Sequence, residues 1–209
     1  MAYDLEEQEQ LDNIKAWWQR YGNLVTWVLI AVFGAIAAWQ YWNHHQRSES
    51  LKASTHYEML STMSSARDIK EIRATAGQII EQYPGTPYAG RAALLAAKAN
   101  YENNDAKSAK AQLEWAMKNA TETSVRAIAQ LQLAAIQFDE KAYDDALKTL
   151  GEKHEAAYDG LIADLKGDVL AAQDKRTEAK AAYAEALTKL EAGSRLQGYT
   201  QHKLDALGD

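Results

Sequence analysis

The side chains in this sequence best suited to hold a metal or move a proton are five scattered histidines. They are His44, His45, His56, His154 and His202. No His-Glu-x-x-His pattern occurs, and neighbouring helical positions such as 44 and 45 point about 100° apart, so no helical pair offers two ligands to one ion. We expect His44 and His45 to be a polar pair at an interface.

Other motifs of catalysis are missing as well. The chain has no cysteine, which removes disulfides, thiolate metal sites and cysteine nucleophiles. It contains neither a glycine-rich phosphate loop nor a Gly-x-Ser-x-Gly elbow, the motifs that cradle phosphates or expose a nucleophilic serine. We therefore predict no catalytic residue, no metal site and no cofactor. An enzyme whose Ser, His and Asp residues converge from distant positions remains an alternative.

Composition favours an all-α protein. Of 209 residues, 47% are hydrophobic, alanine dominates, and Pro84 and Pro87 are the two prolines, a balance that favours long helices over strands. The formal net charge of −6 is spread over both signs, without a basic run that could follow a phosphate backbone. Nucleic acid is not an expected partner.

One segment is predicted to cross a lipid bilayer. Residues 21–43 carry no charge, and about 20 apolar helical residues span the hydrocarbon layer. Aromatic residues, which prefer the headgroup layer, gather at its two ends: Trp17, Trp18 and Tyr21, then Trp39, Tyr41 and Trp42. The chain is thus predicted to comprise an amphipathic tail (1–20), a transmembrane anchor (21–43) and a helical domain (44–209).

Two other interpretations fit this segment less well. A buried core helix would not need aromatic residues at both ends. A cleaved signal peptide is suggested by Ala35-Ile-Ala37, but such peptides begin with net positive charge, and here five acidic residues precede the segment against two basic ones. An uncleaved anchor fits better. Its direction stays open, because Lys15 and Arg20 before it balance Arg47 and Lys52 after it.

Two stripes on this helix could make contacts. Small residues at three- and four-residue spacing, namely Ala31, Gly34, Ala35 and Ala38, could let another transmembrane helix approach closely, although such residues are common in these helices. Upstream, Leu11, Ile14, Trp18 and Tyr21 form one apolar stripe. It is predicted to run along or just above the membrane surface. A plain helical lead-in without a partner is the alternative.

Behind the anchor, the sequence repeats itself. Three segments superpose on the alanines Ala109, Ala146 and Ala179, which are 37 and 33 residues apart, close to the period of about 34 of the tetratricopeptide repeat. Small residues at these positions would let paired helices approach closely. A fourth, divergent pair is expected near residues 48–64 and 68–82. The prediction is a tetratricopeptide-like α-solenoid of about four helix pairs, with an unrelated helical bundle as the alternative.

Helix boundaries follow from turn residues. Thr86 and Pro87 should begin a helix, and Gly151 and Gly193 should end others. A helix around residues 196–207 should cap the open end of the stack.

Binding residues are expected on the first helix of each pair, where such solenoids present their recognition surface. The predicted groove residues are Arg91, Leu94, Lys98, Tyr101, Leu131, Phe138, Asp164 and Asp168. Basic residues at one end and acidic residues at the other could orient a partner segment. Equally, these charges could form a solvated face.

The chain resembles a bacterial family, the YfgM-like ancillary subunits of the Sec translocon. Three stretches carry the resemblance: Val32 to Asn43 leading into a Gln-containing helix, Tyr83-Pro-Gly-Thr-Pro-Tyr-Ala89, and Leu161 to Asp168. The resemblance covers essentially the whole chain, in the order acidic tail, anchor, repeats.

That resemblance implies a place and partners. It implies the bacterial inner membrane, with a cytoplasmic N-terminus and a periplasmic repeat domain. It implies association with the Sec translocon and with a PpiD-type membrane-anchored periplasmic chaperone. The expected role is to help secreted proteins, which could bind while still unfolded, to pass to folding factors. The same architecture would equally serve as a scaffold subunit of another envelope assembly machine.

Overall fold

The computed structural model describes residues 2–66 and 68–208, with side chains described for residues 10–62 and 68–208. These residues form nine α-helices, one 3₁₀ turn and no strand. The chain divides into two compact units, residues 1–48 and residues 49–209. The predicted all-α class is confirmed.

The helix α1 (Ala2–Ala66) contains the whole predicted anchor. Part of it is long and apolar enough to cross a membrane, and its large apolar side chains between Leu24 and Trp42 are exposed, except for the partly buried Val25. The first helix of the repeat domain, expected near residues 48–64, is the last part of this same helix. No proline or glycine lies between residues 35 and 66 to interrupt it.

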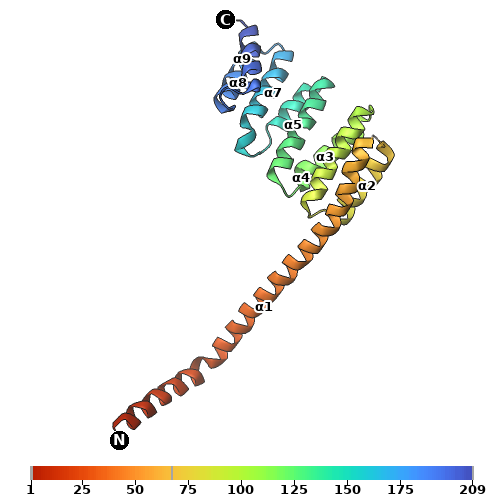
Figure 1. Ribbon diagram of the computed structural model, residues 1–209. Coiled ribbons are helices and arrows are strands. Elements are labelled where there is room, and N and C mark those ends of the chain that lie inside the picture. The colour runs from red at the N-terminus through yellow and green to blue at the C-terminus, as the bar shows by residue number, and fades with distance from the viewer. Residues whose placement is uncertain (1, 67, 209) are drawn as a thin grey trace. The chain divides into compact units, whose positions relative to one another are not determined.

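In the second unit the helices follow in antiparallel pairs along the chain (Figure 1). After α1 come α2 (Ile69–Gln82), α3 (Pro87–Glu102), α4 (Ala106–Asn119), α5 (Thr123–Asp139), α6 (Tyr143–Leu150), η1 (Ala156–Tyr158), α7 (Asp159–Ala172), α8 (Arg176–Lys189) and α9 (Arg195–Ala206). Near the end of α1, Leu60 packs with Ile72, Ala76 and Ile79 of α2, which makes four pairs within the described residues. The predicted number of pairs is confirmed.

Buried small residues set the distance between paired helices. The aligned alanines Ala109, Ala146 and Ala179 are all fully buried. At Gly167 of α7 the approach is closest, because an added Cβ would lie 2.4 Å from a ring carbon of Tyr183 in α8. The close packing inferred from the repeat is therefore present.

The turn inside each pair also repeats. Asn104, Lys141 and Asp174 have positive φ angles of 60–61° and stand at the same 37- and 33-residue spacing as the alanines. In each turn the following N–H donates to the carbonyl five residues back, as in Asp105 to Asn100 at 2.9 Å. This bond closes a Schellman-type helix end. A left-handed residue therefore reverses the chain at the same point of three successive pairs.

Helix ends agree with the predicted turn residues in part. Pro87 opens α3 and Gly151 ends α6, as expected. Thr86 holds the N-cap position, but its hydroxyl donates to the carbonyl of Tyr83 at 2.8 Å instead of capping α3. α8 ends at Lys189, so Gly193 lies in the following turn with a φ of 76°.

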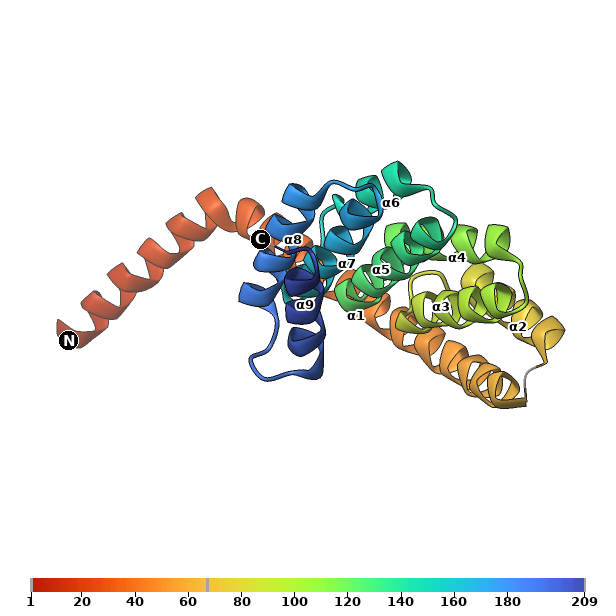
Figure 2. The same cartoon turned by 90° about the horizontal axis from the view of Figure 1, so that it is seen from above.

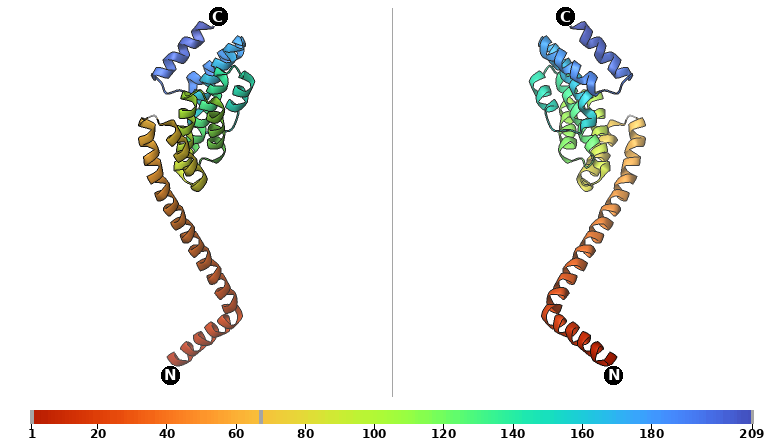
Figure 3. Two further views of the ribbon diagram at one scale, coloured as in Figure 1. Left: turned by 90° about the vertical axis from the view of Figure 1, so that its right-hand side faces the viewer. Right: turned by 90° about the vertical axis from the view of Figure 1, so that its left-hand side faces the viewer.

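The first helices of the pairs adjoin one another. α3 contacts α5, and α5 contacts α7, which Figure 2 shows as a succession. At the end of the stack lies α9, drawn in blue in Figure 3. Its Leu204 and Leu207 pack against the cluster around Leu170 and Tyr183. The predicted C-terminal cap is confirmed.

Replacing Gly167 with alanine should destabilise the last pair. The ring of Tyr183 is 3% exposed and its hydroxyl is tied to Asp168, so it has little room to yield. Overpacking of this kind costs about 1–3 kcal/mol. The loss of stability is measured as a lower thermal unfolding temperature of the purified protein in detergent.

Gly198→Ala is the matched control. This glycine lies inside α9 with no atom within 4 Å of an added Cβ, so alanine should leave the unfolding temperature unchanged or raise it. Equal unfolding temperatures for Gly167→Ala and the unmodified protein would contradict the packing described.

Candidate protein-binding groove

A hollow of about 230 Å³ opens between α3 and α5. Its floor consists of the buried side chains of Ala97, Leu113 and Ile136. Its rim is formed by Lys98, Tyr101, Glu102, Gln132, Ala135 and Asp139. Sites for drug-sized ligands usually measure about 300–1,000 Å³. This hollow is better matched to one or two apolar side chains of a polypeptide.

Tyr101 joins the two helices that form the hollow. Its hydroxyl donates to a carboxylate oxygen of Asp139 at 2.7 Å. That hydrogen bond, together with burial, raises the pKa of the Tyr101 phenol, so the group stays protonated as a donor. The ring itself is 40% exposed. Tyr101 therefore offers an aromatic surface whose position is held by the neighbouring repeat.

The rim carries both charges but more acidic than basic groups. Lys98 lies 3.9 Å from Glu102, and both side chains are more than half exposed. Asp139 adds a second carboxylate beside Tyr101. Exposed pairs such as Lys98 and Glu102 contribute little to stability, so these groups are free to meet charges on a partner.

Of the predicted groove residues, Lys98 and Tyr101 line the hollow and the others have structural contacts. Arg91 donates twice to Glu122, at 2.8 and 2.7 Å, which raises the pKa of its guanidinium. Leu94 packs on the core between α3, α4 and α5. Leu131 and Phe138 pack on the next core, around Ala146 and Val169.

Asp164 and Asp168 are engaged by the capping helix. Lys203 of α9 donates to both carboxylates, at 2.8 and 2.7 Å, and Thr200 donates to Asp164 at 2.7 Å. Burial opposes the charge of Lys203, but these hydrogen bonds outweigh it and raise the pKa of the ammonium. The acidic end of the expected groove is thus a docking site for α9.

Four residues of α5 line the hollow without being among the predicted groove residues: Gln132, Ala135, Ile136 and Asp139. They recur at i, i+3, i+4 and i+7, the spacing of one helix face. The predicted Leu131 and Phe138 begin one residue earlier, which turns them about 100° around the helix. The sequence contains both stripes, and the large apolar side chains of Leu131 and Phe138 lie on the side of α5 that packs on the core.

The small residues proposed for helix contact in the membrane, Ala31, Gly34, Ala35 and Ala38, are all exposed on α1. An added Cβ on Gly34 would meet nothing within 4 Å. Their surface is open to a neighbouring helix.

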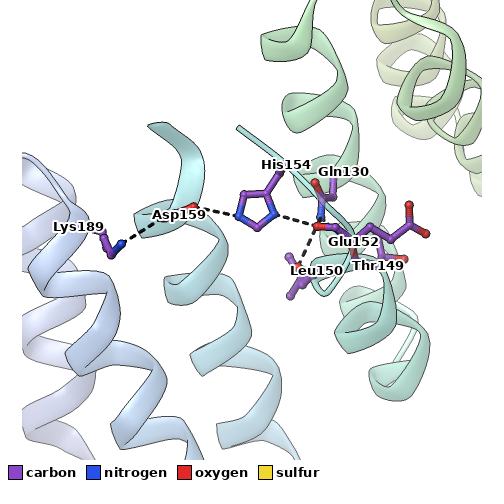
Figure 4. Close-up of polar contacts among 7 residues, drawn as sticks. All are labelled: Gln130, Thr149, Leu150, Glu152, His154, Asp159 and Lys189. Carbon is purple, nitrogen blue, oxygen red and sulfur yellow. Dashed lines mark hydrogen bonds and ion pairs between the residues drawn. The ribbon is translucent and has the colours of Figure 1, made fainter. Parts of the chain in front are cut away.

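His154 has a structural position in the connection from α6 to α7 (Figure 4). One ring nitrogen lies 2.9 Å from the carbonyl of Glu152, the other 3.1 Å from Asp159. The buried amide of Gln130 donates to the carbonyls of Thr149 and Glu152 at 2.8 and 3.1 Å. Lys189, followed by His154, lowers the pKa of Asp159. These hydrogen bonds hold the connection between α6 and α7 in place.

Among the described residues no His, Asp and Glu cluster could hold a metal.

Comparison with known proteins covers nearly the whole chain. Residues 15–209 match the family described as a tetratricopeptide repeat-like domain. The ancillary SecYEG translocon subunit of Neisseria gonorrhoeae is 31% identical over 208 residues, covering 99% of this chain and all of that protein. The subunit of the same name from Aggregatibacter actinomycetemcomitans is 32% identical, with 99% and 100% covered. That of Escherichia coli is 28% identical, with 96% of each chain covered. No solved structure matches.

Lys203→Met should release α9 from the stack. Asp164 is 7% exposed, and removing its ammonium partner leaves a buried carboxylate poorly compensated, which costs about 1–3 kcal/mol. Hydrogen exchange should accelerate in α9 while α3 and α4 keep their protection. Lys175→Met, at an exposed position before α8, is the control. Unchanged exchange in α9 of the Lys203 variant would refute the docking role.

Proposed function

Because this chain belongs to the family of ancillary SecYEG translocon subunits, we propose that it is a membrane-anchored interaction module that associates with the Sec translocon. The observation that carries the proposal is one continuous helix, α1, which holds an exposed apolar segment and also supplies the first helix of the repeat stack. A subunit of this kind binds other polypeptides and needs no catalytic centre.

The anchor is proposed for residues 21–43. This uncharged stretch of 23 residues measures about 34 Å as a helix, enough for a hydrocarbon layer of about 30 Å. Exposed side chains such as Trp27, Phe33 and Ile36 would be stabilised by lipid, since apolar area in water is unfavourable. We propose that the N-terminus lies in the cytoplasm and the repeats in the periplasm of a bacterial inner membrane, the arrangement that the family resemblance implies.

The hollow between α3 and α5 is the proposed contact with translocating chains or with a PpiD-type chaperone. It offers an apolar floor to an inserted side chain and an exposed tyrosine to pack against it. Aromatic anchors of this kind dominate binding energy at protein interfaces. An ancillary subunit with such a site could hold a secreted segment as it leaves the translocon and pass it on to a folding factor.

Photo-crosslinking in living cells tests the association. A photoreactive residue at Ala35, which faces outward from α1, should capture a transmembrane subunit of the translocon. One at Gln132 or Ala135 in the hollow should capture a secreted chain or the chaperone, more strongly when translocation is stalled.

The matched control is Ala181, an exposed residue of α8 that lines a different depression, between α6, α7 and α8. It should give little product. Absence of translocon products from Ala35 together with absence of chaperone or client products from the hollow would overturn the proposal. Equal capture from Ala181 and Ala135 would remove the hollow as the contact.

A further inference from the structure

The beginning of α1 carries an apolar stripe that is wider than the predicted one, because Trp17 belongs to it as well. At 100° per residue, five side chains fall within an arc of about 120°: Leu11, Ile14, Trp17, Trp18 and Tyr21. The remaining arc holds Asp12, Asn13, Lys15, Ala16, Gln19 and Arg20. We call the five the aromatic stripe. Residues 11–21 thus form a strongly amphipathic helical segment.

The aromatic stripe is open. Its members are 55%, 63%, 50%, 54% and 42% exposed in sequence order. The described part of the unit formed by residues 1–48 is α1 alone, so no second element of that unit covers it. Each large aromatic ring buries about 150–250 Å² when it finds a partner. Three such rings beside Leu11 and Ile14 leave a large apolar surface uncovered.

The rings gather on one side of the helix. The centroid of Trp17 lies 6.3 Å from that of Trp18 and 5.8 Å from that of Tyr21. The guanidinium of Arg20 lies 5.7 Å from the Tyr21 ring centre. Trp and Tyr concentrate where hydrocarbon meets headgroups, and a cation beside them can pair with a phosphate. The segment therefore carries the groups suited to that layer.

The stripe cannot belong to the membrane-crossing part. Asp12, Lys15 and Arg20 lie on the polar arc, and charges on a helix within the hydrocarbon are costly. Between Arg20 and Arg47 the sequence contains no Asp, Glu, Lys or Arg. At this junction the Trp18 indole packs closely against Gly22, where an added Cβ would lie only 3.1 Å from the ring. Figure 3 shows the red N-terminal part of α1 set at an angle to the helix that follows.

We propose that residues 11–21 lie in the plane of the membrane interface, with the aromatic stripe in the headgroup and acyl boundary of the bilayer that α1 crosses. The inference rests on the proposed anchor, since the occupant is lipid of the same membrane. Such helices insert their apolar face by about 5–10 Å. The segment fixes the depth at which α1 enters the bilayer, and its polar arc faces the aqueous side.

A cysteine scan of the intact protein tests this directly, because the chain has no cysteine of its own. Each residue from 11 to 21 is replaced in turn, spin-labelled, and measured in nanodiscs of phosphatidylcholine and phosphatidylglycerol. Labels at the aromatic stripe should collide several-fold more with oxygen, relative to a water-soluble nickel complex, than labels at Asp12, Lys15 or Gln19. The ratio should oscillate with a helical period.

Labels at Val28 and Phe33 in the anchor and at Lys175 in the repeats are the references. Nickel access at Val28 and Phe33 would refute the anchor itself. With those two protected, nickel access on every face of residues 11–21 would show a helix in water and overturn this inference alone. Protection of the stripe from both reagents would indicate a protein partner and would also overturn it.

Discussion

Close approach between paired helices is the constraint on which the repeat domain depends. At Gly167 even a Cβ would meet the ring of Tyr183, and the aligned alanines are fully buried. The same spacing recurs in the three left-handed turns, so the chain reverses at the same point of three successive pairs, although α6, with 8 residues, is shorter than α4 and α8, with 14 each. Such pairs stack in one direction, with α3 beside α5 and the hollow between them.

Polar contacts then join each repeat to the next. Arg91 reaches Glu122, Tyr101 reaches Asp139, and Asp164 accepts from Thr200. Partners in each case stand about one repeat apart in sequence, so each contact stabilises the interface between neighbouring pairs. Exposed examples contribute modestly. Their value to function is positional: the Tyr101 ring beside the hollow is held by the repeat that forms the opposite wall.

Much of this architecture could be predicted from the sequence, because small-residue spacing, turn residues and apolar length are local signals. The four pairs, the helical cap and the apolar helix follow from them. Which face of α5 lines the hollow could not be predicted, because Leu131 and Gln132 are neighbours in sequence. Only the packing of the helices decides that Leu131 lies against the core and Gln132 in the hollow. Nor does the sequence show that Asp164 and Asp168 meet Lys203, a contact made across 35 to 39 residues.

The central proposal is that α1 crosses a membrane and holds the repeats on its far side. Balanced flanking charges do not set its direction, so topology is its most direct test. A reporter enzyme that requires disulfides, and therefore folds in the oxidising periplasm, is fused after Asp209. With this reporter we expect an active fusion. A second fusion, to a reporter that works only in the cytoplasm, should be inactive. The reverse pattern would contradict it.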